Sequence, residues 1–198
     1  NQLIFGYVLA DIWFSSNENV NPQLTDQVAV GYFRNFFDNN LEASVEGYYK
    51  WLDDAIDFKD HAQLLGNEQL DGEVRQGKGY AYGVEFYVRK KYGKLTGWVS
   101  YTWSLTRRKI DDINNGDPYP TTFDRPHDLK IVLSYDITPR LNFNSNWVFY
   151  TAMPFTVPTS YSRYQNSYYP NFSDRNSFRY PGTNYHRLDL GLTWNFHK

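Results

Sequence analysis

Apolar and polar residues alternate with a period of two along residues 41–51. One set of alternate positions is apolar throughout: Leu41, Ala43, Val45, Gly47, Tyr49 and Trp51. The other set carries polar and charged groups: Glu42, Ser44, Glu46, Tyr48 and Lys50. Successive side chains of a β-strand point to opposite faces of the sheet, so this pattern predicts a strand with one apolar and one polar face.

Further stretches show the same alternation, which predicts an all-β chain. The seven predicted strands cover about 26–36, 41–52, 80–90, 95–106, 128–137, 141–150 and 187–196. The predicted strand at 26–36 has two candidate apolar faces. We favour the face with Val28, Val30 and Tyr32 over the one with Ala29, Gly31 and Phe33. The strands are about 10 to 12 residues long, the length needed to cross a bilayer at a tilt.

The connections between these strands alternate strictly between short and long. The short ones are residues 37–40, 91–94 and 138–140, and the long ones are 53–79, 107–125 and 151–183. Transmembrane barrels have short periplasmic turns on one rim and long extracellular loops on the other. A Greek-key sandwich gives no reason for such an alternation. We therefore predict a segment of a transmembrane antiparallel β-barrel, with its apolar face toward lipid.

Composition agrees with this fold and excludes several function classes. Aromatic residues make up 19% of the chain, with 18 Tyr, 14 Phe and 6 Trp, and such residues concentrate at membrane interfaces. A soluble, Tyr-rich carbohydrate-binding sandwich would also have this composition. A net charge of −2 gives no electrostatic case for nucleic acid, and the absence of cysteine excludes disulfides and zinc–sulfur sites. The mean hydropathy of −0.67 is compatible with a barrel, since only alternate residues face lipid.

No pattern indicates catalysis, a metal or a cofactor. The four histidines lack a trustworthy metal-binding spacing: His61, His127, His186 and His197. Glu42 and Glu46 share one strand face and could form a glycosidase pair, but charge facing a wet lumen explains them more simply. The acidic segment 53–79 could bind a hard cation, although a solvated loop is the favoured interpretation. We expect a protein that is not an enzyme.

A Tyr- and Arg-rich stretch between residues 153 and 180 is the candidate ligand-binding segment. Aromatic and Arg side chains stack on flat or sugar-like ligands and bind carboxylates. The predicted contact residues are Arg163, Tyr164, Tyr168, Tyr169 and Arg175. An equally weighted alternative is a loop that packs on its neighbours or on a surface lipoprotein.

Four segments resemble one family of membrane proteins. Residues 16–22 and 25–27, Ser-Asn-Glu-Asn-Val-Asn-Pro and Thr-Asp-Gln, are similar to an N-x-x-N-P-E segment, with Gln23 in place of the acid. Residues 79–86 resemble a GxxxGVE strand opening, residues 122–129 resemble an FDRPH segment, and residues 185–190 resemble a late barrel strand. In this order they resemble the TonB-dependent outer-membrane receptor and transporter family of the Bacteroidetes type, in the C-terminal part of its barrel.

The resemblance implies a 22-stranded barrel filled by an N-terminal plug and energised by the TonB–ExbB–ExbD system. Residues 1–198 would be part of this single barrel domain, with the plug upstream of Asn1 and the final strands after Lys198, because seven strands cannot close such a barrel. The expected function is active import of a scarce nutrient across the bacterial outer membrane: a ferric siderophore, haem, cobalamin, an oligosaccharide or a peptide. The alternatives are a non-transporting barrel with a structural or adhesive role and, less favoured, a secreted glycan-binding β protein.

Overall fold

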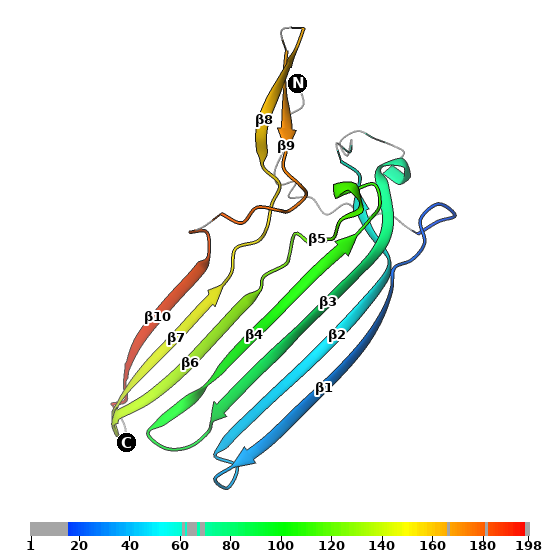
Figure 1. Ribbon diagram of the computed structural model, residues 1–198. Coiled ribbons are helices and arrows are strands. Elements are labelled where there is room, and N and C mark those ends of the chain that lie inside the picture. Colours follow the sequence, from blue (N-terminus) through cyan, green and yellow to red (C-terminus); the bar gives the residue numbers. More distant parts are fainter. Residues whose placement is uncertain are drawn as a thin grey trace.

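The structure is a computed structural model that describes residues 16–60, 62, 67, 70–165, 167–180 and 182–196. Its main element is a single antiparallel sheet (Figure 1). The strands are β1 (Leu24–Phe36), β2 (Leu41–Phe58), β3 (Val74–Lys90), β4 (Leu95–Lys109), β5 (Tyr119–Pro120), β6 (His127–Thr138), β7 (Leu141–Tyr150) and β10 (Tyr185–Trp194). A separate hairpin consists of β8 (Pro158–Tyr164) and β9 (Ser167–Phe172). Two 3₁₀ helices lie at Leu70–Glu73 and Asn114–Gly116.

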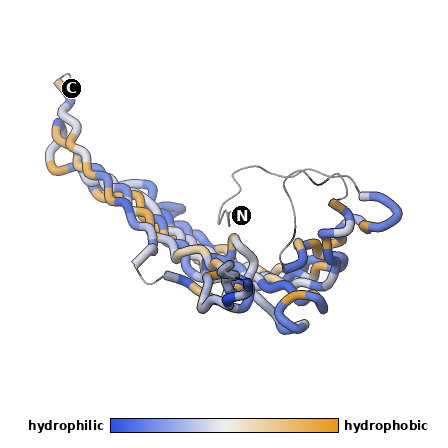
Figure 2. The backbone as a smooth tube through the Cα atoms, turned by 90° about the horizontal axis from the view of Figure 1, so that it is seen from above, coloured by the Kyte–Doolittle hydropathy of each residue, from blue (hydrophilic) through white to orange (hydrophobic). Residues whose placement is uncertain are grey.

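The long strands pair in the order β1-β2-β3-β4-β6-β7-β10, and the short β5 adds to β4. Neighbours in sequence are therefore neighbours in space, as in an up-and-down barrel wall. Seen from above, the sheet forms one open layer (Figure 2). No helix within the described residues is long and apolar enough to cross a membrane.

The seven predicted strands are all present, and 141–150 has the predicted bounds. The main differences are at the end of the sheet that carries the long connections. There β2 continues to Phe58 and β3 begins at Val74, so part of the segment predicted as a loop is paired strand. The last strand covers Tyr185–Trp194 and ends two residues before the predicted position. Polar side chains are compatible with these strand extensions because the ladder hydrogen bonds come from the backbone.

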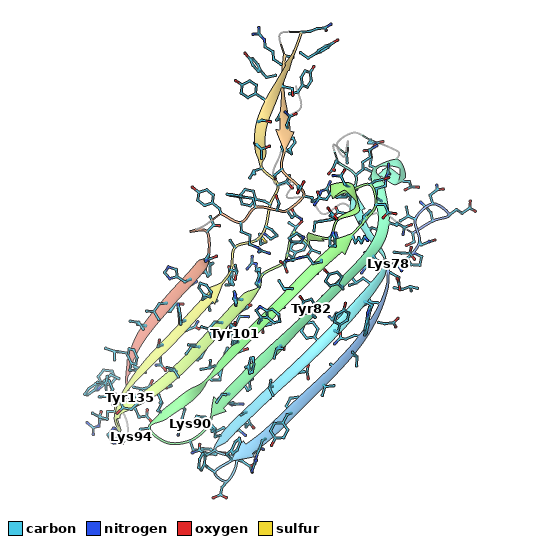
Figure 3. The ribbon with its side chains drawn as sticks, in the orientation of Figure 1. Lys78, Tyr82, Lys90, Lys94, Tyr101 and Tyr135 are labelled. Atoms are coloured by element: carbon cyan, nitrogen blue, oxygen red, sulfur yellow. The ribbon has the colours of Figure 1, made fainter. Side chains whose placement is uncertain are left out.

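The cross-strand register places the predicted apolar positions on one continuous face. One row across the sheet consists of residues opposite one another: Tyr32, Val45, Phe86, Tyr101, Leu129 and Phe149. Because directly paired residues share a face, the favoured face of the first strand, which contains Val28, Val30 and Tyr32, is the one that continues this surface. Tyr82 and Tyr101 lie on it between Lys78 near one end and Lys90 near the other (Figure 3).

The short turns share one end of the sheet and the long connections share the other (Figure 1). The β1–β2 turn uses consecutive left-handed residues, with φ of 52° at Phe37, 53° at Asp38 and 65° at Asn39. The β3–β4 turn contains Gly93 with φ of 105°. Asp, Asn and Gly tolerate this region best, which makes these sequences suitable for tight turns.

A β-bulge interrupts β2 near the long-connection end. Leu52 pairs with Gly79 and Ala55 pairs with Gly77, so β2 has one extra residue there, and Asp54 has a left-handed φ of 53°. The extra residue puts Ala55 on the same face as Leu52. The next alternate residue, Asp57, therefore also points to the polar face of the sheet.

The buried cluster of the described residues lies under the long connections rather than on the sheet. It consists of Ile110, Ile113 and Tyr119, which are at most 2% exposed. Among the described residues no second layer covers the apolar face of the sheet, and large side chains such as Val30 and Leu192 are 76% and 68% exposed. This face is therefore unlike the inner face of a sandwich, which packs on another sheet.

Candidate functional site

The connection between β7 and β10, here called the third loop (residues 151–184), projects beyond the sheet as the β8–β9 hairpin (Figure 1). Arg163 on β8 lies opposite Tyr168 on β9. Four of the five predicted ligand-binding residues are together on this hairpin: Arg163, Tyr164, Tyr168 and Tyr169. The three tyrosines among them are exposed.

One face of the hairpin is aromatic and cationic. The rings of Tyr161 and Tyr168 meet edge to face with centroids 5.3 Å apart, and the Arg163 Cζ lies 5.7 Å from the Tyr168 centroid. Arg over an aromatic face is an attractive cation–π geometry. Tyr161, which is 70% exposed, therefore joins the predicted residues as part of this surface.

The other face of the hairpin is polar. The Asn171 Nδ2 donates to Ser160 Oγ and to Ser162 Oγ, both at 3.0 Å. Strand alternation places Tyr164 and Tyr169 on this face as well. A planar or sugar-like molecule could stack on the tyrosines and accept hydrogen bonds from the hydroxyl and amide groups.

The base of the hairpin is fixed by a short bridge. The backbone N–H groups of Phe155 and Phe178 donate to each other's carbonyl oxygens at 2.9 and 3.2 Å, and the two rings meet edge to face at 5.4 Å. Aromatic pairs in this geometry add about 0.5–1.5 kcal/mol beyond the area that they bury. The bridge closes the third loop where the hairpin leaves it.

Arg175, the fifth predicted residue, lies away from the hairpin and binds the first loop (residues 59–73) and the end of β2. Its Nη1 donates to Asp57 Oδ1 at 3.0 Å and to the Phe58 carbonyl at 2.8 Å, and its Nη2 donates to Asp60 Oδ1 at 2.6 Å. The side chain is only 18% exposed. The structure therefore separates Arg175 from the tyrosines and places it in a contact between loops.

Asp57 is the centre of a polar network that also includes the second loop (residues 110–126). The Tyr119 hydroxyl donates to Asp57 Oδ2 at 2.8 Å, and the Arg108 Nη1 lies 3.4 Å from the same oxygen. Burial, and next the negative charge of Asp57, raises the pKa of the Tyr119 hydroxyl well above its ordinary value. Tyr119 is thus held as a neutral donor.

Asp124 of the second loop forms a second network with two arginines. Its Oδ2 accepts from Arg107 Nη1 at 2.8 Å and from Arg179 Nη2, and its side chain is 1% exposed. Arg179 Nη1 also donates to the Ala152 carbonyl at 2.6 Å. Burial lowers the pKa of the Arg179 guanidinium, and Asp124 opposes that shift. This network joins the third loop to the second.

The two networks connect all three long loops, which the sequence analysis did not predict. We define the loop clamp as the pairs of Arg175 with Asp57 and Asp60, and of Arg179 with Asp124. A signal was present in the sequence, since the first long connection, residues 53–79, is mainly acidic and the third, residues 151–183, is mainly basic. The sequence gives the charges but not which loops lie side by side. It therefore could not identify which aspartate each arginine contacts.

Other candidates for chemistry show structural contacts. Glu42 pairs with Lys91 beside a short turn, and Glu46 lies in register with Glu85 on the polar face. The His127 Nδ1 lies 2.8 Å from the Tyr101 hydroxyl. His61 and His197 lie outside the described residues. In the described part of the chain, no group of three or more His, Cys, Asp or Glu residues could hold a metal ion.

Comparison with known proteins identifies a receptor barrel. The family model described as "TonB dependent receptor-like, beta-barrel" matches residues 2–198. The comparison with curated proteins gave no match.

Among solved structures, the fold is similar to that of the ferripyoverdine receptor of the outer membrane of Pseudomonas aeruginosa, solved with ferripyoverdine bound. The TM-score is 0.61 at 12% sequence identity, over 90% of this chain. The chain corresponds to only 22% of that receptor's length. At this identity the likeness shows the fold alone.

Proposed function

The chain belongs to the TonB-dependent receptor β-barrel family, and from this premise we propose that the complete protein actively imports a scarce nutrient across the bacterial outer membrane. Members of this family are outer-membrane transporters and not enzymes, and we propose no catalytic chemistry for this protein. The observation that carries the proposal is a continuous apolar face on an antiparallel sheet, in a chain that the family model matches almost from end to end.

The apolar face has the features expected of a surface in lipid. On β3 the outward positions between Lys78 and Lys90 are all uncharged: Tyr80, Tyr82, Val84, Phe86 and Val88. At about 3.3 Å per residue and a tilt of about 45°, this stretch spans roughly 28 Å along the membrane normal. That height is close to the apolar band of an outer-membrane barrel, about 25 Å.

The shape of the sheet supports one orientation. Barrels of this type have short turns on the periplasmic side and long loops outside the cell. We therefore place Asn39, Gly93 and Pro139 in the periplasm, and the clamped loops with the β8–β9 hairpin outside.

We propose that the rest of the transport machinery lies in other parts of the protein. Residues 1–198 would form part of one barrel domain, and the plug and further strands would complete it. The plug would couple the barrel to TonB, ExbB and ExbD. This division agrees with the small share of the ferripyoverdine receptor that the chain covers.

We propose that the hairpin contacts the cargo through Arg163, Tyr164, Tyr168 and Tyr169. Exposed Tyr and Arg side chains are the residues most often found at binding hot spots. Arg175 would contribute indirectly, as a positioning residue that fixes the loop. The cargo classes to compare are ferric siderophores, haem, cobalamin, oligosaccharides and peptides. A surface lipoprotein is the alternative partner for the same hairpin.

An uptake experiment tests the import proposal. Cells that carry the complete gene should accumulate one radiolabelled compound from a panel of these five classes, and a strain without the gene should not. Loss of TonB, or collapse of the proton gradient, should abolish accumulation because the plug cannot then be moved. Accumulation that persists without TonB would contradict the proposal and favour a passive barrel.

Cysteine labelling on whole cells tests the orientation. Single cysteines at Asp117 and Asn171 should react with an impermeant thiol reagent, since both lie in the proposed external loops. Cysteines at Asn39 and Gly93 should react only after the outer membrane is opened. Labelling of both sets in intact cells would indicate a secreted protein, and the reverse pattern would invert the orientation.

A further inference from the structure

Arg125, near the end of the second loop, stacks on a tyrosine at the loop end of the sheet. Its Cζ lies 4.1 Å from the centroid of the Tyr150 ring. Tyr150 is the last residue of β7, and its neighbour Phe149 belongs to the apolar face. Because successive side chains of a strand point to opposite faces, the Tyr150 ring and the guanidinium over it lie on the polar face.

A second ring extends this stack across β7. Tyr185, the first residue of β10, lies directly opposite Tyr150, and the two rings are stacked with centroids 4.6 Å apart and planes at 12°. Arg125 comes from the side of β6 and Tyr185 from the side of β10, and these strands are the two neighbours of β7. A guanidinium that stacks on a ring keeps the N–H donors at its edge available to a ligand.

The charge of Arg125 is not neutralised within the part of the chain that the structure describes. Its side chain forms no hydrogen bond or ion pair with another described residue. The carboxylates on this side of the loops and of β6 and β10 are engaged by other cations: Asp124 by two arginines, Asp128 by Lys130 at 3.1 Å and Asp189 by Arg187 at 2.9 Å. The stack therefore presents one positive charge with unused donors.

The stack lies where the loops meet the sheet. Tyr150 and Tyr185 flank the third loop, whose β8–β9 hairpin projects beyond the sheet (Figure 1). In the orientation proposed above, this place is the outer entrance of the lumen, below the hairpin. A compound that moves from the hairpin into the barrel would pass the edge of the Arg125 guanidinium.

From this geometry we propose that Arg125 binds a carboxylate group of the cargo at the entrance of the lumen, and that Tyr150 and Tyr185 hold the guanidinium in position. Two parallel N–H···O bonds from one guanidinium match the two oxygens of a carboxylate, and one guanidinium balances its single charge. The inference rests on the proposed import function and narrows it to cargo with a free carboxylate, such as haem, a peptide or an acidic oligosaccharide.

The test uses pairs of probes that differ only in the charge of the carboxylate. The pairs are haem and haem dimethyl ester, a short peptide with a free and with an amidated C-terminus, and an oligogalacturonate and its methyl ester. Isothermal titration would measure their binding to the purified complete receptor, plug included. At least one free acid should bind about tenfold or more tightly than its neutral partner, which is the lower limit expected for hydrogen bonds to a charged group.

Variants of the stack should change this preference in a graded way. R125Q should weaken binding of the free acid about tenfold or more and leave binding of the neutral partner unchanged. R125K should recover part of the preference, because it keeps the charge but not the planar fork. Y150L should weaken binding of the free acid about two- to fivefold, the value of a cation–π contact at a partly exposed site.

Arg140 provides the matched control. It is exposed in the turn between β6 and β7, at the opposite end of these two strands. R140Q removes the same charge and should leave the binding of both partners unchanged. Equal losses in R125Q and R140Q, binding of the neutral partners alone, or failure of every free acid to bind would overturn the proposal.

Binding and uptake measurements separate this site from the import function. Binding to the purified receptor does not need TonB, so a preference for the free acid that depends on Arg125, without uptake, would support the site and contradict import. TonB-dependent uptake of a neutral compound, unchanged in R125Q, would support import and overturn the site. Heat-modifiable gel migration of each variant shows whether the barrel has assembled before its binding is measured.

Discussion

In the sheet each strand is held by its neighbours in sequence, whereas the long loops are held by residues far apart in the chain. The β6–β7 pair is joined by a turn at Pro139 and Arg140, but Arg175 reaches Asp57 across 118 positions. The sheet has no buried side-chain layer among the described residues, and the loops contain the buried Ile110, Ile113 and Tyr119. The two regions should therefore respond to mutation in different ways. The sheet should be sensitive to a change of polarity on either face, and the loops to the loss of a single hydrogen-bond or ion-pair partner.

The largest effect is expected on the apolar face. Val99→Arg should reduce barrel stability by about 2–4 kcal/mol if the position is near the bilayer midplane. Thr102→Arg is the matched variant on the polar face, where Glu85 and Asp128 lie directly opposite in register, so it should be much milder. Heat-modifiable migration and urea unfolding in liposomes would measure both. Equal damage at the two positions would contradict the face assignment.

An intermediate effect is expected from breaking the loop clamp. Asp124→Ala leaves Arg107 and Arg179 without their carboxylate partner, and the loss of a partner of a charged group costs about 1–3 kcal/mol. The cost should be local, with an assembled barrel and faster hydrogen exchange in the second and third loops. Asp128→Ala, at a half-exposed ion pair on β6, is the control and should leave loop exchange unchanged. Unchanged exchange in Asp124→Ala would mean that the clamp does not hold the loops.

Mutations in the β8–β9 hairpin are expected to have a similar or smaller effect, and to change cargo binding without changing barrel stability. Replacing Arg163, Tyr168 and Tyr169 by Ala should weaken cargo binding by about 2 kcal/mol if these residues form a hot spot. Isothermal titration with the compound identified by uptake would measure it, and the barrel should assemble normally. Normal affinity with loss of a co-purified lipoprotein would instead assign the hairpin to a protein partner.

The smallest effect concerns alkaline pH. The pKa of Tyr119 is raised in the folded protein, so its hydrogen bond to Asp57 stabilises the loops fully below the ordinary tyrosine pKa of 10.0. This contribution should fall as pH rises above 10 toward the folded pKa. Tyr119→Phe should cost about 1 kcal/mol of loop stability at neutral pH and remove that pH dependence. Exchange rates measured between pH 8 and 11 would check it, and an identical pH profile in the variant would contradict it.

The sheet was predictable because alternation is a local signal. Residues 141–150 show it at most positions, and the predicted bounds agree with β7. The strand extensions in β2 and β3 were missed because polar residues such as Asp57 and Arg75 gave no alternation to follow, while the backbone pairing continued. The β8–β9 hairpin was not predicted, because Tyr, Ser and Asn occur on both of its faces and give no apolar–polar alternation. Its residues had nevertheless been selected as a binding segment.

The site was only partly predictable. Arg163, Tyr164, Tyr168 and Tyr169 lie on one hairpin, since they are close in sequence, but Arg163 and Tyr168 are on one of its faces and Tyr164 and Tyr169 on the other. Arg175 is equally close in sequence but belongs to another contact, because its partners are on β2 and the first loop. Pairings across long distances depend on the whole fold, which no local pattern contains.

The bulge in β2 allows the strand to lose one residue without a change of phase. Deleting Asp54 would give uninterrupted alternation with Ile56 and Asp57 on the faces that they now occupy, because Ala55 already lies on the face of Leu52. Arg175 and Tyr119 would then keep their shared acceptor. One residue inserted between Ala55 and Asp57 would instead turn Asp57 to the lipid side and remove that acceptor, so this insertion should be more harmful to the loops than the deletion.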